Sequence, residues 1–141
     1  MSTGPAIAVA VTFVWLGMVV AISFVEAPLK FRAPSVTLQV GLGIGRLVFR
    51  ALNTVEVGFA LVILAIVAAV PTPARIAVTF SVAMATLAIQ LIAVRPRLTR
   101  RSDQVLAGLD APRSRAHYAY VGLEVVKTAA LLAAGILLLT V

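Results

Sequence analysis

The chain has 141 residues, of which 62% are hydrophobic and only 12% charged, and its mean hydropathy is +1.10. A soluble domain would carry about 25% charged residues, so too little polar surface is present to cover a water-facing globule. The net charge is +7, but the sequence has no aromatic platform or groove-reading helix, which argues against nucleic acid as a partner. The absence of cysteine excludes disulfides and thiol chemistry. We therefore expect an all-α integral membrane protein.

Four apolar runs are long enough to cross the hydrocarbon core as helices, which takes about 20 residues each. Strands are not expected, because the runs are too long and lack alternation of apolar and polar residues. The sequence predicts a single domain, residues 1–141, folded as a four-helix bundle. In chain order its predicted spans cover residues 5–25, 46–70, 76–94 and 117–141.

The segment between the first two spans allows two interpretations. Pro34 and Ser35 are typical of a helix start, and no breaker stronger than glycine follows before Pro71. Residues 36–45 therefore either extend the second helix or bend before it at their glycines. The second span then reaches the third through residues 71–75 alone, so these two spans are predicted to be antiparallel neighbours.

Basic residues mark one side of the predicted bundle. Ten of them flank or fill two loops: Lys30, Arg32, Arg46 and Arg50 around the first, and Arg95, Arg97, Arg100, Arg101, Arg113 and Arg115 in the loop between the third and fourth spans. The opposite side holds Arg75 alone. Because cytoplasmic loops carry the excess of lysine and arginine, both basic loops are predicted to be cytoplasmic and both termini outside, in the plasma (inner) membrane of a prokaryote.

Anionic lipid headgroups are expected partners of this basic side, at about 1 kcal/mol for each basic residue near the surface. The long loop, residues 95–116, is predicted to lie on the headgroups, with a short interfacial turn at 104–109. The residues expected to contact headgroups are Lys30, Arg32, Arg95, Arg97, Arg100 and Arg101.

The polar side chains inside the spans are the most informative, because ionisable groups in hydrocarbon are costly and usually face the bundle interior with a partner. In the second span these residues are spaced by four, three and three positions: Arg46, Arg50, Asn53 and Glu56. In the fourth span they are spaced by three, four and three positions: His117, Tyr120, Glu124 and Lys127. Each set is therefore predicted to share one helical face. At about 1.5 Å per residue, Glu56 and Lys127 lie about 15 Å deep. The predicted site, in the cytoplasmic half of the bundle, comprises Arg50, Asn53, Glu56, Gln90, His117, Tyr120, Glu124 and Lys127.

This polar cluster has three interpretations, which the sequence leaves open. In the first, Glu124 pairs with Lys127, Arg50 either pairs with Glu56 or extends to the headgroups, and the ion network only holds the helices together. In the second, the cluster is a pocket or half-channel open to the cytoplasm that binds an anion, a lipid headgroup or a proton. In the third, its charges complete the polar network of another membrane subunit.

No catalytic or cofactor site is predicted. His117 is the only histidine, which cannot supply a bis-histidine haem or a typical zinc site, and it is expected to be an interfacial residue. Trp15, near the middle of the first span, is expected to pack against another helix. No Ser–His–Asp triad or metal motif is present, and an enzyme acting on lipid would need Glu56 with His117, which lie about 15 Å apart in depth.

Three short motifs carry a family resemblance: a tryptophan–glycine pair at residues 15–17, Ala27-Pro28 followed by Phe31, and glycine and phenylalanine at 45 and 49. They resemble a family of small four-helix membrane proteins, made up of bacterial proteins of unknown function and a eukaryotic relative associated with platinum-drug resistance. The stretch 117–120 is similar to the family's histidine at the start of the fourth span, whereas Glu124 with Lys127 departs from the pattern. The resemblance implies a four-helix fold and no particular activity.

The leading functional hypothesis is a non-enzymatic, multi-pass membrane protein that transports or binds an anionic or amphipathic solute through the polar cluster. Four helices rarely enclose a transport path alone, so a homo-oligomer is expected. The alternative is an accessory subunit of a larger membrane complex, which would fit a chain with so little mass outside the membrane.

Overall fold

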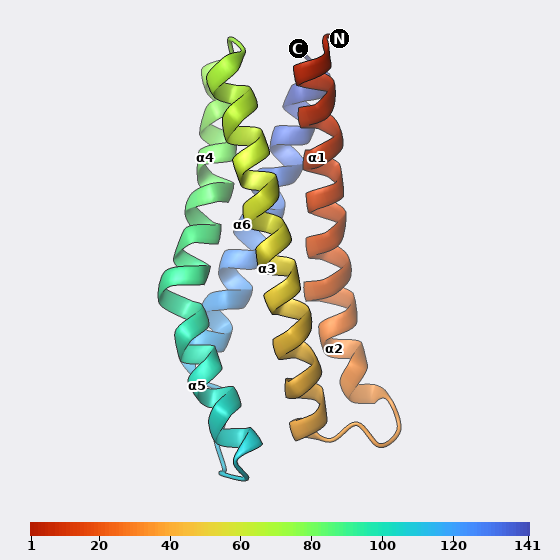
Figure 1. The fold of residues 1–141 in the computed structure, drawn as a ribbon, viewed down its shortest axis with the longest axis vertical. Coiled ribbons are helices and arrows are strands. Elements are labelled where there is room, and N and C mark those ends of the chain that lie inside the picture. Colours follow the sequence, from red (N-terminus) through yellow and green to blue (C-terminus); the bar gives the residue numbers. More distant parts are fainter.

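Four long helices run side by side in the computed structural model, which describes all 141 residues (Figure 1). Each is long and apolar enough to cross a membrane, which confirms the all-α class and the four predicted spans. The continuous helical stretches are Thr3–Arg32, Leu38–Ala69, Ala74–Leu106 and Arg115–Leu139.

Two of these stretches change helix type along their length. The first comprises α1 (Thr3–Val19), a π-helical segment η1 (Val20–Glu26), α2 (Ala27–Leu29) and a final 3₁₀ turn η2 (Lys30–Arg32). The third comprises α4 (Ala74–Ile89), a π-helical segment η3 (Gln90–Val94) and α5 (Arg95–Leu106). The second and fourth are the uninterrupted α3 (Leu38–Ala69) and α6 (Arg115–Leu139).

The segment between the first two spans is mostly helical. Pro28 does not end the first helix, because the π-helical segment η1 runs directly into α2 and Pro28 lies in the first turn of α2. Thr37 caps α3 by accepting a hydrogen bond from the backbone N–H of Val40 at 3.2 Å. Residues 38–45 therefore extend the second helix, which decides between the two interpretations of this segment.

The third helix is longer than predicted. Residues 95–106 form α5, a 12-residue continuation of the span, where the sequence predicted a loop on the headgroups. The prediction of a loop was wrong, because the first left-handed residue after the third span is Gly108, with a φ of +85°. The position of this segment on the headgroups stays a prediction. Arg46 on α3 pairs with Asp103 on α5 at 2.6 Å, and the Gln39 amide donates to the carbonyl of Val105 at 3.1 Å. These contacts hold α5 against the start of α3.

The packing order of the bundle differs from the chain order. Helix α6 packs against both α1 and α4, and α1 packs against α3, whereas α3 and α4 touch only sparingly. The second and third spans are antiparallel, as predicted, but they are weak neighbours because the turn at 71–73 joins only their ends. Small buried residues on α6, Ala130, Ala134 and Gly135, allow close approach to two helices at once.

The two ends of the bundle differ in character (Figure 1). Both chain termini and the turn at 71–73 lie at one end, which we call the terminal end. The loops that follow η2 and α5 lie at the other end, together with ten of the twelve basic residues, and we call it the basic end. Which end faces the cytoplasm stays a prediction.

Apolar side chains fill the bundle from its middle to the terminal end. The cluster nearest the terminal end joins all four spans through Ala8, Ile63, Ile76, Phe80, Ala134 and Leu138. Outward-facing side chains are also apolar: Leu47 is 71% exposed and Ile92 79% exposed. Such a surface matches lipid as the surrounding solvent.

Candidate functional site

A buried group of polar side chains lies near the middle of the bundle, centred on Lys127. Its Nζ lies 2.5 Å from Glu56 Oε2 and 2.6 Å from Glu124 Oε1, and it donates a third hydrogen bond to Gln90 Oε1 at 2.9 Å. Each of these four residues is at most 1% exposed. An ammonium has three N–H groups, so Lys127 is fully satisfied by partners on α3, η3 and α6.

The first span adds two further donors. The indole Nε1 of Trp15 donates to Glu56 Oε2 at 2.8 Å, and the hydroxyl of Ser23 donates to Glu124 Oε2 at 2.7 Å. All four spans therefore contribute to one network, the mid-bundle cluster, whose members are Trp15, Ser23, Glu56, Gln90, Glu124 and Lys127. The sequence predicted only that Trp15 would pack, and it missed Ser23, because a single hydroxyl in an apolar run is an ordinary feature of membrane helices.

Both π-helical segments supply a residue to this cluster. Ser23 lies within η1 and Gln90 begins η3. A π-turn inserts an extra residue into an α-helix and rotates the side chains that follow, and such turns are frequent at functional positions. Periodicity at 3.6 residues per turn therefore fails at these two places, which explains why sequence spacing did not bring Ser23 into the site.

The cluster is deep within the bundle. Lys127 is 12 residues from each end of α6, and the network closes there on partners from the other three spans. On its terminal side the neighbouring buried cluster is apolar and comprises Trp15, Val19, Ala83, Leu87, Ala130 and Leu131. Further polar groups lie on the side of the cluster that faces the basic end. The cluster is therefore bordered by apolar side chains toward the terminal end and by polar side chains toward the basic end.

Toward the basic end, aromatic rings and cations extend the polar region. The guanidinium of Arg95 stacks 4.7 Å from the ring centroid of Tyr120 and 5.2 Å from that of Phe49. Tyr120 donates its hydroxyl to Asn53 at 3.5 Å, and its backbone carbonyl accepts from the Gln90 amide at 3.3 Å. Tyr120 thus connects Arg95 with the mid-bundle cluster.

Arg50 and His117 lie outside the cluster, although the sequence grouped them with it. Arg50 is exposed on α3, because a helix turns by about 100° per residue and six residues place it about 120° from Glu56 around the axis. His117 is partly buried near the start of α6, with its ring 5.4 Å from that of Tyr118. Spacings of four and three residues are each close to one helical turn, so they did not reveal this rotation along α3.

The end of the first span packs closely against two glycines of α3. An added Cβ at Gly41 would overlap the ring of Phe31, and one at Gly45 would lie 2.7 Å from the Nζ of Lys30. Lys30 lies 3.8 Å from Glu26 and 5.8 Å from the ring centroid of Phe49. Its side chain is only 10% exposed, so this residue is largely enclosed by protein and offers little to the headgroups it was predicted to contact.

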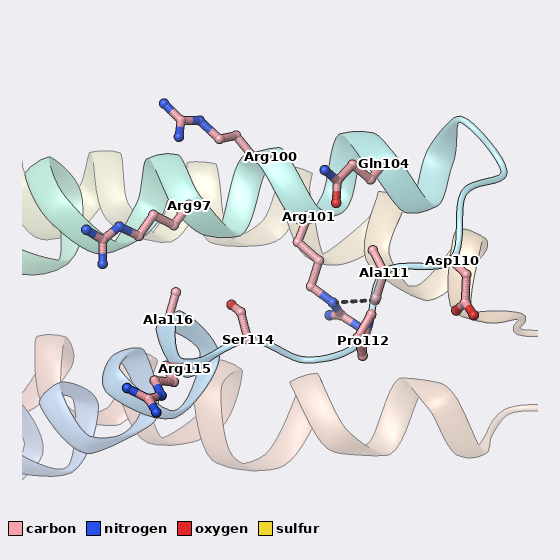
Figure 2. Close-up of a pocket in the computed structure, with 10 residues that line it drawn as sticks. All are labelled: Arg97, Arg100, Arg101, Gln104, Asp110, Ala111, Pro112, Ser114, Arg115 and Ala116. Atoms are coloured by element: carbon pink, nitrogen blue, oxygen red, sulfur yellow. Dashed lines mark hydrogen bonds between the residues drawn. The ribbon is translucent and has the colours of Figure 1, made fainter.

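A pocket of about 390 Å³ opens at the basic end, between α5 and the segment that leads into α6 (Figure 2). Four arginines line it, Arg97, Arg100, Arg101 and Arg115, against one acidic residue, Asp110. In Figure 2, the side chain of Arg97 lies between the two elements, that of Arg115 lies over the first turn of α6, and that of Arg100 points away from the pocket.

Local contacts give this pocket its shape. Arg101 donates from Nε to the carbonyl of Ala111 at 3.0 Å, which ties the segment before α6 to α5. Ser114 precedes the first turn of α6, and its side chain makes no capping hydrogen bond there. Ser114, Arg115 and Ala116 all line the pocket, so the N-terminus of α6, which is the positive end of its helix dipole, lies at the pocket.

Apart from Lys30, the headgroup residues predicted from sequence divide into two sets. Arg32, Arg97 and Arg100 are exposed at the basic end, where they are free to meet anionic groups. Arg95 and Arg101 are partly buried and bound to the protein, Arg95 by its aromatic neighbours and Arg101 by Ala111.

No family of proteins, curated protein or solved structure matches this chain. The resemblance to the small four-helix family stays a prediction. No group of three histidine, cysteine, aspartate or glutamate side chains lies close enough together to hold a metal ion. The structure therefore contains two candidate sites, a closed ion network at mid-bundle and an open, arginine-lined pocket at the basic end.

Proposed function

We propose that this chain is a non-enzymatic, multi-pass membrane protein that binds a phosphate-bearing, anionic amphiphile at the arginine-lined pocket. The observation that carries the proposal is the pocket itself, in which four arginines oppose one aspartate. The ligand class is the anionic or amphipathic solute expected from the sequence, but the site is at the basic end and not in the polar cluster.

The chemistry of the lining favours phosphate. Guanidinium groups bind phosphate oxygens through paired N–H donors, and the lining arginines come from two elements, with Arg97 on α5 and Arg115 on α6. The N-terminus of α6 adds backbone N–H groups and positive dipole potential on the same side. A volume of about 390 Å³ lies within the range of about 300–1,000 Å³ that is usual for small-molecule sites.

Its position favours an amphiphile over a free anion. The pocket lies where α5 and α6 leave the apolar part of the bundle. A molecule with a phosphate headgroup and an acyl chain can therefore place its charge among the arginines and its tail along the exposed apolar faces. We propose that the basic end lies in the cytoplasmic leaflet of a prokaryotic plasma membrane, and the charge bias of the loops supports this orientation.

Binding is better supported than transport. Lys127, Glu56 and Glu124 bond to one another and not to a solvent-filled space, and apolar clusters fill the bundle from there to the terminal end. A polar solute would have to break this ion network to cross a single chain. A path between copies of the chain is not needed for the proposed function.

Native mass spectrometry of the chain in mild detergent, with added phosphatidylglycerol or phosphatidylcholine, tests the proposal. The wild type should retain one phosphatidylglycerol, and the double variant Arg97→Ala/Arg115→Ala should bind it about 30-fold more weakly, as expected for the loss of about 2 kcal/mol from two basic contacts. The control is Arg32→Ala/Arg50→Ala, which removes the same charge from exposed positions outside the pocket.

Retention in the control variant equal to that in the wild type supports a defined site. Equal weakening in both double variants would mean that net charge alone attracts the lipid, and the proposal would fail. A protein that remains bound in fixed stoichiometry instead of lipid would favour the accessory-subunit alternative.

A further inference from the structure

The mid-bundle cluster contains an imbalance of charge. It holds two carboxylic acids, Glu56 and Glu124, and a single cation, Lys127. The three N–H groups of Lys127 each meet an oxygen, which identifies its side chain as the charged ammonium, since a neutral amine has only two. With both acids ionised the cluster would carry one net negative charge in a fully buried position, an arrangement that proteins avoid.

The two carboxyl groups are not equivalent. Both oxygens of Glu124 accept contacts from donors: Oε1 from Lys127 and Gln90, and Oε2 from Ser23. Glu56 concentrates its contacts on Oε2, which meets Lys127 and Trp15, and its Oε1 is buried without any partner. An ionised carboxylate carries negative charge on both oxygens, and a buried charge without a donor costs more than a buried hydroxyl without an acceptor. The contacts therefore favour the ionised form for Glu124 and the neutral form for Glu56.

We propose that Glu56 carries a proton on Oε1 and that the mid-bundle cluster is a proton-binding site. This site is distinct from the arginine-lined pocket and does not depend on the function proposed for it. With Glu56 neutral, Lys127 and Glu124 form a balanced pair and the cluster has no net charge. Adding a proton creates an O–H bond at Oε1, and releasing it leaves a buried carboxylate beside the Glu124 carboxylate.

The groups that face Glu56 from other elements support this assignment. Trp15 on α1 is neutral, Gln90 on η3 is neutral, and Lys127 and Glu124 on α6 offset each other. A metal cation is a poorer occupant than a proton, because hard cations take six or more oxygen ligands and the cluster leaves only one free oxygen beside an ammonium.

The polar route to Glu56 comes from the basic end. Asn53 lies three residues before Glu56 on α3 and accepts from the Tyr120 hydroxyl, and both are less than 8% exposed. On the other side of Glu56 stand Trp15 and the apolar cluster around it. Protons therefore reach and leave the site from the basic end, where the arginine-lined pocket also lies.

Infrared spectroscopy of the reconstituted chain, labelled with ¹³C in its glutamate carboxyl groups, tests the proposal. The chain has only three glutamates, Glu26, Glu56 and Glu124. The C=O band of a protonated acid is separate from the bands of carboxylates. In the wild type at neutral pH, one labelled glutamate should show this band, and Glu26→Gln should leave it unchanged.

Two matched variants locate the proton. In Glu56→Asp the proton-bearing group is an unlabelled aspartate, so the ¹³C shift of the band should disappear; in Glu124→Asp the shift should remain. A third variant, Glu124→Gln, tests the charge balance without altering Glu56: one acid then faces one ammonium, and the band should be lost. Circular dichroism checks that each variant remains helical.

The results separate cleanly. No labelled acid band in the wild type at neutral pH overturns the proposal, with no variant required. The opposite pattern in the aspartate pair would assign the proton to Glu124, and a band that persists in Glu124→Gln would refute the role of charge balance. The route is tested by Asn53→Leu, which should slow the response of the band to a pH jump; an unchanged rate would exclude Asn53 from it.

Discussion

Replacing Lys127 with methionine removes the only positive charge from the mid-bundle cluster while keeping an unbranched side chain of similar length. Glu124 then loses the ammonium 2.6 Å away and keeps only Ser23 and Gln90 as donors. Removing one partner of a buried ion pair costs about 3–5 kcal/mol, because the remaining charge is uncompensated. We expect Lys127→Met to lower the free energy of unfolding by this amount.

The natural control is an ion pair of equal length in a different environment. Arg46 and Asp103 also lie 2.6 Å apart, but their side chains are 40% and 58% exposed. Exposed pairs are worth about 0.2–1 kcal/mol, since water solvates each charge once the other is removed. Arg46→Met should therefore cost several-fold less than Lys127→Met, although the two distances are equal.

Unfolding by sodium dodecyl sulfate in mixed micelles, followed by far-ultraviolet circular dichroism, measures both variants on one scale. Adding Glu124→Gln to Lys127→Met should recover part of the loss, because no buried ionised group then remains in the cluster. Equal losses for Lys127→Met and Arg46→Met, or a loss below about 1 kcal/mol for Lys127→Met, would refute the conclusion that burial makes this network strong.

The remaining predictions concern packing and the tryptophan. Gly135→Ala should destabilise the bundle by about 1–3 kcal/mol in the same unfolding assay, because its Cβ would lie 2.7 Å from the ring of Phe13; Gly122→Ala, which meets nothing within 4 Å, should not destabilise it. Trp15→Phe should cost about 0.5–1.5 kcal/mol by removing the donor to the neutral Glu56 carboxyl group, and a loss no larger than that of Gly122→Ala would contradict this. The sole tryptophan is 0% exposed, so its fluorescence should resist aqueous quenchers added at either side of a vesicle, and strong quenching would place it elsewhere.

The extent of the helices shows where sequence patterns stop being informative. Hydropathy identified all four spans, because lipid requires about 20 apolar residues of each. It did not show that helix continues through residues 26–32 and 95–106, since polar residues outside the hydrocarbon form helix as readily as loop. Contacts such as Arg46 with Asp103 stabilise that continuation, and such pairs are invisible before the helices are packed.

The candidate site was predicted in part. Asn53, Glu56, Gln90, Tyr120, Glu124 and Lys127 are all buried, as expected for polar residues that would be costly in lipid. Arg50 lies elsewhere because each three-residue step falls about 60° short of a full turn, and two such steps separate it from Glu56. Ser23 entered the cluster through a π-helical segment, which no hydrophobic period indicates.

The amino-acid sequence by itself determined that the chain forms four helices long and apolar enough to span a membrane, that its basic residues gather at one end, and that Glu56, Glu124 and Lys127 belong inside the bundle. These follow from transfer free energies of individual residues, which depend on composition and not on neighbours. Only the tertiary structure decided which groups meet: that Lys127 bridges two glutamates, that Glu56 Oε1 has no partner, and that arginines from α5 and α6 form one pocket. Those contacts depend on the rotation and order of the helices, which close packing sets and a single helix cannot specify.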